Sequence, residues 1–234
     1  MNQSKTAPYQ IGMLIFDQMT NLDFAGPHDV FARLPNTVVH VIAKQMQPIV
    51  TDIGGRVLPS ASLEQAPQLD LIFVGGGPGT TALLDDDEVL EFLSRQAEHA
   101  QWVTSVCTGA LVLGAAGLLR GYKAATHWTA MNVLVPFGAE PVHSRVVVDR
   151  NRITGGGVTA GIDFGLTIAG LLHGEGLAQA MQLGMEYNPE PPYRSGSPDV
   201  APPDILEKVR QGSSRLTATR MEAAERIARL RGWI

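Results

Sequence analysis

The only cysteine of the chain, Cys107, lies where a buried strand is expected to end and a helix to begin. The β-branched run 102–106 before it is typical of a strand, and residues 109–113 after it are typical of the first turns of a helix. This arrangement predicts a nucleophile elbow, in which the sulfur faces the unpaired N–H groups of a helix N-terminus and thiolate is favoured over thiol. Because a lone cysteine often serves as a small buried hydrophobe, packing is the alternative role.

A carboxylate is expected at the same edge of the sheet. Asp23 follows the first predicted strand, residues 11–16, and lies between two large apolar residues. Near a thiolate, like charge and desolvation raise the pKa of a carboxyl group, so that it carries a proton at neutral pH. Asp23 would then act first as a general acid and later as a base. Its alternative role is that of a helix cap.

Two further features are expected beside the sulfur. The glycine-rich turn 75–79 follows another buried strand, and its backbone N–H groups, with Gly76 and Gly77 among them, are placed to face a developing negative charge. Thr108 directly follows the cysteine and offers an N–H group and a hydroxyl. Phosphate binding is the usual alternative for a glycine-rich turn, but no lysine follows this one as in a P-loop.

His127 and Trp128 come at the end of a short predicted strand, residues 124–126. His127 is expected to approach the thiol from the side, either as a catalytic group or as a structural residue, which is the commoner role of a single histidine. Trp128 is expected to form a wall of the pocket. The remaining histidines show no metal-ligand spacing, so we expect no metal.

Strands alternate with helical segments along most of the chain, and several strands end in glycine-rich turns. This pattern predicts an α/β fold with a doubly wound, mostly parallel sheet flanked by helices, a flavodoxin-like three-layer sandwich. In such a fold the site lies at the carboxyl ends of the strands. One helix is expected over 28–34, with Pro27 in its first turn, and a long apolar helix over 160–172.

The chain of 234 residues is expected to form a single domain over 1–234. Its core covers about 10–187, a proline-rich crossing segment covers 187–203, and an amphipathic C-terminal surface helix covers 204–232. This helix is expected to lie on its own subunit or on a partner's, which favours a homodimer without establishing one.

The net charge of −5 comes without a dense block of Lys or Arg, which argues against nucleic acid or an anionic membrane as a partner. No apolar run reaches membrane-spanning length, and the N-terminus shows no signal peptide. A single cysteine excludes an intrachain disulfide framework. We therefore expect a cytoplasmic protein.

Several segments together resemble the ThiJ/PfpI superfamily, which is related to the class I glutamine amidotransferase fold. The segments are Leu22 to Val30, Thr104 to Gly109, Thr126 to Trp128 and Thr154 to Asp163. The resemblance runs from Gln10 to about Tyr187, and within the superfamily the chain is most similar to the isocyanide hydratase branch.

This resemblance implies a homodimeric hydratase that converts an isocyanide and water into an N-substituted formamide, with neither a metal nor an organic cofactor. It implies Cys107 as the nucleophile, Asp23 as the acid and base, and the amides of Gly77 and Thr108 as oxyanion donors. A cysteine thioimidate is the expected intermediate. Asp23 stands where many members carry glutamate, and Thr108 where the peptidase branch carries histidine, which argues against peptidase activity. A glyoxalase-type hydratase of small oxoaldehydes and a non-enzymatic cysteine redox sensor are the alternatives.

Overall fold

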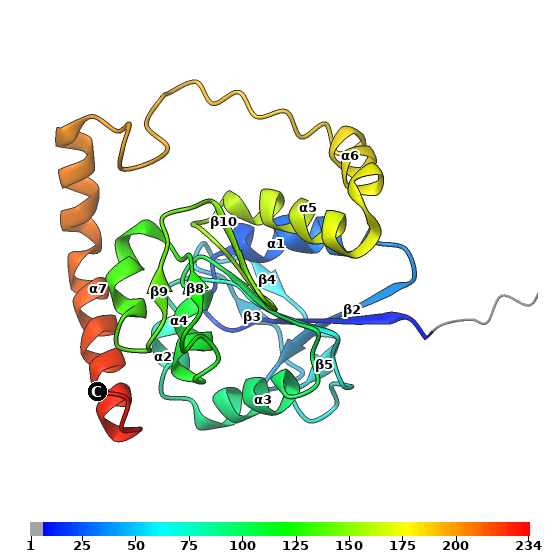
Figure 1. Ribbon diagram of the computed structural model, residues 1–234, viewed down its shortest axis with the longest axis horizontal. Coiled ribbons are helices and arrows are strands. Elements are labelled where there is room, and N and C mark those ends of the chain that lie inside the picture. The colour runs from blue at the N-terminus through cyan, green and yellow to red at the C-terminus, as the bar shows by residue number, and fades with distance from the viewer. Residues whose placement is uncertain (1–6) are drawn as a thin grey trace, which may run out of the picture.

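A seven-stranded sheet forms the centre of the computed structural model, which describes residues 7–234 (Figure 1). The strand order is β10-β11-β7-β6-β1-β2-β5, and every neighbouring pair is parallel except β10 with β11. The strands are β1 (Tyr9–Leu14), β2 (Thr37–Ala43), β5 (Ala61–Ser62), β6 (Leu71–Val74), β7 (Trp102–Val106), β10 (Val146–Asp149) and β11 (Arg152–Gly155). The predicted α/β fold with a mostly parallel sheet is confirmed.

Helices cover both faces of this sheet, which is why its central strands are almost entirely buried (Figure 1). One face carries α1 (Asn21–Phe31), α5 (Ala160–His173) and α6 (Glu175–Gly184). The other carries α2 (Thr80–Leu83), α3 (Asp87–Ala97), α4 (Gly109–Ala115), the 3-10 helix η1 (Trp128–Leu134) and α7 (Pro203–Leu230). The carboxyl ends of β1, β6, β7 and β11 therefore meet at one edge, between the two helical layers.

Helix α1 differs from its prediction. It begins at Asn21 and ends at Phe31, so the expected helix over 28–34 with Pro27 in its first turn is wrong. Pro27 lies inside the helix, where its missing N–H removes only the bond to the carbonyl four residues before it. The proline ring packs closely against Gly161 of α5. A Cβ at that position would lie only 2.8 Å from Pro27 Cδ. The earlier start places Asp23 in the first helical turn.

Two small sheets lie outside the central one. A hairpin forms between β3 (Ile49–Val50) and β4 (Arg56–Val57). The short strand before His127 is β8 (Lys123–Ala124), and it pairs with β9 (Glu140–Pro141). His127 therefore does not follow a strand of the central sheet.

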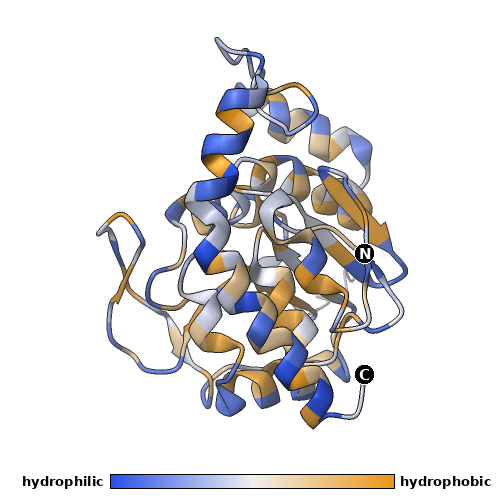
Figure 2. Cartoon of the chain, turned by 90° about the vertical axis from the view of Figure 1, so that its left-hand side faces the viewer, coloured by the Kyte–Doolittle hydropathy of each residue, from blue (hydrophilic) through white to orange (hydrophobic). Residues whose placement is uncertain are grey.

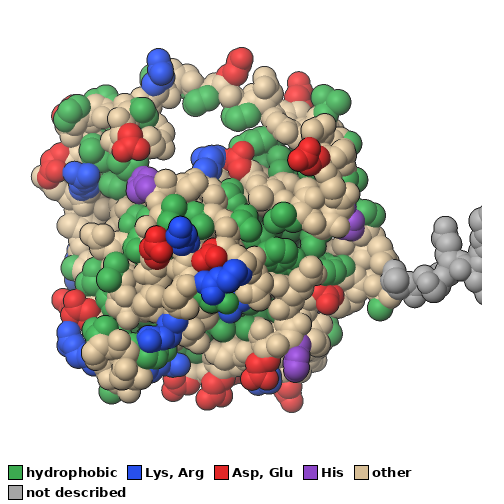
Figure 3. Space-filling model, viewed as in Figure 1, with side chains coloured by type: hydrophobic (Ala, Val, Ile, Leu, Met, Phe, Trp, Pro, Cys, Tyr) green, Lys and Arg blue, Asp and Glu red, His purple; other side chains and the backbone are tan. Residues whose placement is uncertain are grey.

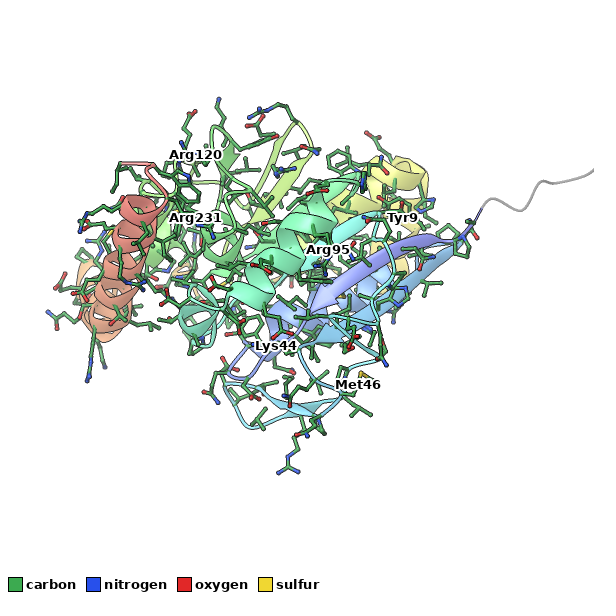
Figure 4. The ribbon with its side chains drawn as sticks, turned by 90° about the horizontal axis from the view of Figure 1, so that it is seen from below. Tyr9, Lys44, Met46, Arg95, Arg120 and Arg231 are labelled. Atoms are coloured by element: carbon green, nitrogen blue, oxygen red, sulfur yellow. The ribbon has the colours of Figure 1, made fainter. Side chains whose placement is uncertain are left out.

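The C-terminal part runs along one side of the molecule. Residues 187–202, called the arch below, contain neither helix nor strand and lead from α6 to α7 (Figure 1). Helix α7 mixes hydrophilic and hydrophobic residues along its length (Figure 2). Just after the helix, the ring centroid of Trp233 lies 4.8 Å from the Arg120 guanidinium and 5.4 Å from that of Arg231. Figure 4 labels Arg120 and Arg231 near this end of α7. Within residues 7–234, no helix is long and apolar enough to cross a membrane.

Candidate active site

Cys107 occupies a tight turn between β7 and α4. Its φ of +52° lies in the left-handed region, which non-glycine residues rarely adopt. The turn is held by its neighbours, because Cys107 N–H donates to the carbonyls of Gly155 and Gly156, and Thr126 Oγ1 donates to the Cys107 carbonyl at 2.8 Å. This is the geometry of a nucleophile elbow, with the sulfur presented at the centre of the sheet edge.

Asp23 is fully buried in the first turn of α1, beside the sulfur. Its Oδ2 accepts a hydrogen bond from Gly76 N–H at 3.2 Å, and the carboxyl group also hydrogen-bonds with the Cys107 thiol. Oδ1 has no partner among residues 7–234. A Cβ at Gly76 would lie 2.6 Å from Cys107 Cβ and 2.8 Å from Asp23 Oδ2, so only glycine fits at this position.

Burial sets the protonation of this pair. It raises the pKa of Asp23 to about 7, an effect that hydrogen bonds from Cys107 and Gly76 reduce and the Asp52 charge increases. Burial also raises the pKa of the Cys107 thiol, and the Asp23 charge adds to this effect. A helix N-terminus alone would lower the pKa of the thiol and favour the thiolate. The pKa of Cys107 is raised instead, because desolvation outweighs the helix dipole. The two groups therefore titrate as one unit that holds a single proton just above neutral pH.

The N–H groups that face the sulfur are only partly those expected. Thr108 N–H and Val158 N–H hydrogen-bond with the sulfur and lower the pKa of Cys107. The Gly77 N–H, an expected oxyanion donor, is instead donated to Thr108 Oγ1 at 3.1 Å. The Gly76 N–H is likewise used by Asp23. In this structure the glycine turn thus holds the functional side chains in place.

Sequence reasoning did not identify Val158. Its φ of +30° is unusual for a β-branched residue. The available signal was its position, since it follows the glycines 155–157 at the carboxyl end of β11, which is hydrogen-bonded to β7. A group in that place lies next to Cys107.

A cavity of about 200 Å³ opens onto the sulfur. Its lining includes Cys107 and Thr108 from the elbow, His127, and Leu216 and Arg220 from α7. This volume suits a small organic molecule. Neither of the α7 residues was expected at the site.

His127 and Trp128 take different places. His127 Nδ1 accepts from Thr129 N–H at 3.3 Å and caps η1. Burial and the charge of Arg220 lower the pKa of His127, so the ring is neutral. Trp128 lines an adjacent cavity of about 370 Å³ that His127 also lines. Within residues 7–234, no three His, Cys, Asp or Glu side chains come together as a metal-ligand set.

The sheet order, the elbow at Cys107 and the buried Asp23 define an α/β protein with a buried cysteine and carboxyl pair at the carboxyl ends of its central strands. The family model of the DJ-1/PfpI family matches residues 9–171, and the chain belongs to this family. The predicted resemblance to the ThiJ/PfpI superfamily is thereby confirmed.

Individual relatives match over different shares of their length. The isonitrile hydratase of Pseudomonas putida is 48% identical over 219 residues, which cover 94% of this chain and 96% of that protein. The crystal structure of a ThiJ/PfpI family protein from Pseudomonas syringae is 41% identical, with a TM-score of 0.91, and the match covers 93% of this chain and 90% of that one. The HTH-type transcriptional regulator GbdR of Pseudomonas aeruginosa is 30% identical over 74% of this chain, but the match covers only 49% of the regulator.

Proposed function

We propose that this chain is an isocyanide hydratase, which adds water to an isocyanide and releases an N-substituted formamide. The observation that carries the proposal is Cys107 on the wall of a small cavity with the fully buried Asp23 carboxyl beside it, in a chain 48% identical over nearly its whole length to an isonitrile hydratase. The pair holds one proton, and hydration of an isocyanide requires one nucleophile and one proton at the same carbon.

In the first step, the terminal carbon of R–NC accepts both the nucleophile and the proton. Asp23 takes the thiol proton while Cys107 Sγ bonds to the carbon, and Asp23 then delivers that proton to the same carbon. The product is a thioimidate, R–N=CH–S–Cys107, and Asp23 is again a carboxylate. Thr108 Oγ1, held by Gly77 N–H, lies on the cavity and is the group we expect to hydrogen-bond the substrate nitrogen.

In the second step, water attacks the thioimidate carbon. Asp23 removes a proton from this water, and the proton passes to the substrate nitrogen. The C–S bond then breaks, the proton of the new hydroxyl returns through Asp23 to the sulfur, and R–NH–CHO leaves. Because His127 is neutral and caps η1, the acid and base steps belong to Asp23.

The test is direct. Purified protein is mixed with a panel of alkyl and aryl isocyanides, and the formyl proton of the formamide is followed by NMR. Wild type is expected to turn over several of them, and C107A none, with an unchanged circular dichroism spectrum. The proposal fails if no formamide forms, or if C107A keeps its turnover. Lactate from methylglyoxal would instead identify the glyoxalase alternative.

We also propose that the protein is a homodimer, as the resemblance implies. Apolar side chains next to and within the arch are exposed, among them Leu183 at 82% and Tyr193 at 79%, and Ile205 and Val209 of α7 are also exposed. Figure 3 shows an opening beneath the arch, with hydrophobic side chains along its rim. Size-exclusion chromatography with light scattering is expected to give twice the chain mass, and a monomer would contradict the proposal. The cytoplasmic location stays a prediction.

A further inference from the structure

Arg220 is buried in an apolar stripe of α7. Its side chain is 4% exposed, and it shares one face of the helix with Ala223, Ala224, Ile227 and Ala228. A buried arginine costs free energy unless its donors are hydrogen-bonded and its charge is balanced. Both conditions are met by groups of the active site.

The donors of Arg220 bind one turn of the chain. Its Nη2 donates to the Gly77 carbonyl at 2.7 Å and to Thr80 Oγ1 at 3.0 Å, and its Nε donates to Thr81 Oγ1 at 3.1 Å. Gly77 lies in the turn that joins β6 to α2, and Thr80 and Thr81 lie at the start of α2. The same turn also donates the Gly76 N–H to Asp23. The guanidinium therefore holds in place the backbone that positions the reactive pair.

The charge of Arg220 faces the same pair. Within residues 7–234, no carboxylate lies within 4.0 Å of the Arg220 guanidinium. Arg220 and Cys107 line the same cavity, and the neutral His127 is the other titratable group on its wall. The negative charge of Asp52 also acts on Asp23 and raises its pKa.

We infer that Arg220 is a positioning residue for the reaction. It holds the Gly76–Gly77 turn against Asp23, and its positive charge balances the single negative charge of the Cys107–Asp23 pair. This role rests on the proposed function, because the reaction that it serves is isocyanide hydration. Without the arginine, the pair retains a second proton to higher pH, and the thiol has no base to accept its proton.

The experiment compares R220M with R226M. Arg226 lies on the same helix and forms an exposed ion pair with Asp85, which makes it a matched control. The rate of Cys107 alkylation by iodoacetamide is measured against pH by mass spectrometry, together with kcat and KM for hydration. In R220M the midpoint of the acidic limb is expected to move up by about one pH unit. Its kcat is expected to fall about 10- to 100-fold with little change in KM, and R226M to match wild type.

A midpoint that stays in place in R220M would overturn the inference, even if stability and kcat both fall, because a purely structural role changes those alone. R220K is expected to restore the midpoint and part of kcat. If R220M does not fold, R220K is compared with R226K: the midpoint should stay at the wild-type value and kcat should fall several-fold, since an ammonium group lacks the planar donor geometry. A shifted midpoint or an unchanged kcat in R220K would then contradict the inference.

Alkylation needs no isocyanide, so the two proposals fail separately. If R220M shifts the alkylation midpoint while wild type hydrates no isocyanide, the proposed function is wrong and the pairing of Arg220 with Cys107 stands. If wild type hydrates isocyanides and R220M behaves as R226M does, the role of Arg220 is wrong and the function stands.

Discussion

Residues 9–171, which match the DJ-1/PfpI family, and the terminal helix α7 contribute to the site in different ways. The matched residues supply both proposed reacting groups, Cys107 and Asp23, and hold them through backbone N–H groups at the carboxyl ends of strands. Helix α7 lies outside the match and supplies Leu216 and Arg220, which line the same cavity. The chemistry thus belongs to the shared fold, whereas part of the cavity wall and the balancing charge come from a segment beyond it.

This difference has a physical consequence. A change in the reactive pair removes a bond-forming or proton-carrying atom. A change in α7 alters the shape or the potential of the cavity and leaves the reacting atoms present. Effects on turnover should therefore be largest for the pair and smaller for the inner face of α7, which carries Leu216 and Arg220 on the cavity wall. They should be smallest for the outer face, which carries the exposed Arg226.

The largest effect among the following substitutions is expected for D23N. An amide cannot take the thiol proton or deliver it to carbon, so kcat should fall about 10²- to 10⁴-fold. Formamide production measures the change, and D29N serves as a control because Asp29 lies on the same helix and forms an exposed ion pair with Arg33. Turnover of D23N close to that of wild type would assign the proton transfer to another group.

The pH dependence should show the same carboxyl group. Below the pKa of Asp23, raised to about 7 by burial, both members of the pair carry protons and no base is free. The value of kcat/KM should therefore fall about tenfold per unit as pH drops below that value, and rise through it towards pH 8. A flat profile between pH 5 and 8 would show that Asp23 does not act as the base.

A smaller effect is expected on the inner face of α7. L216F narrows the cavity without touching the reacting atoms, so the ratio of kcat/KM for cyclohexyl over methyl isocyanide should fall about tenfold. The pH midpoint should not move. An unchanged ratio, measured with both substrates in parallel, would mean that α7 does not bound the substrate site in solution.

The smallest effect is expected on the outer face. The ion pair between Arg226 and Asp85 is about half exposed on both sides, and such pairs contribute about 0–1 kcal/mol. R226A should therefore change the melting temperature by no more than about 2–4 °C and leave turnover intact. A large loss of turnover in R226A would show that the outer face of the helix also affects the reaction.

Features encoded by neighbouring residues were predictable from the sequence. The elbow at Cys107 needs only a strand, a tight turn and a helix in succession, and all three are visible in residues 102–113. The position of Asp23 at the same edge was predicted because the carboxyl ends of parallel strands lie at one edge of the sheet. The start of α1 was wrong, since Pro27 indicates a helix N-terminus locally but is accommodated within the helix by its contact with Gly161.

Arg220 shows why the rest was not predictable. It lies in phase with the apolar residues 223, 224, 227 and 228, but among many charges this spacing did not identify a buried arginine. Its partner Gly77 is 143 residues away, and no local pattern relates the two. The use of the Gly77 N–H by Thr108 depends in the same way on where two separate turns meet.

The residues along the chain specify which groups are able to react, because a thiol on an elbow and an acid after the first strand are properties of short segments. Folding specifies their protonation and their surroundings. Burial raises the pKa of both members of the pair, against the effect of the helix N-terminus, and α7 brings a cation to a site formed far earlier in the chain. Desolvation and charge act through space, so they depend on neighbours that only the packed structure assembles.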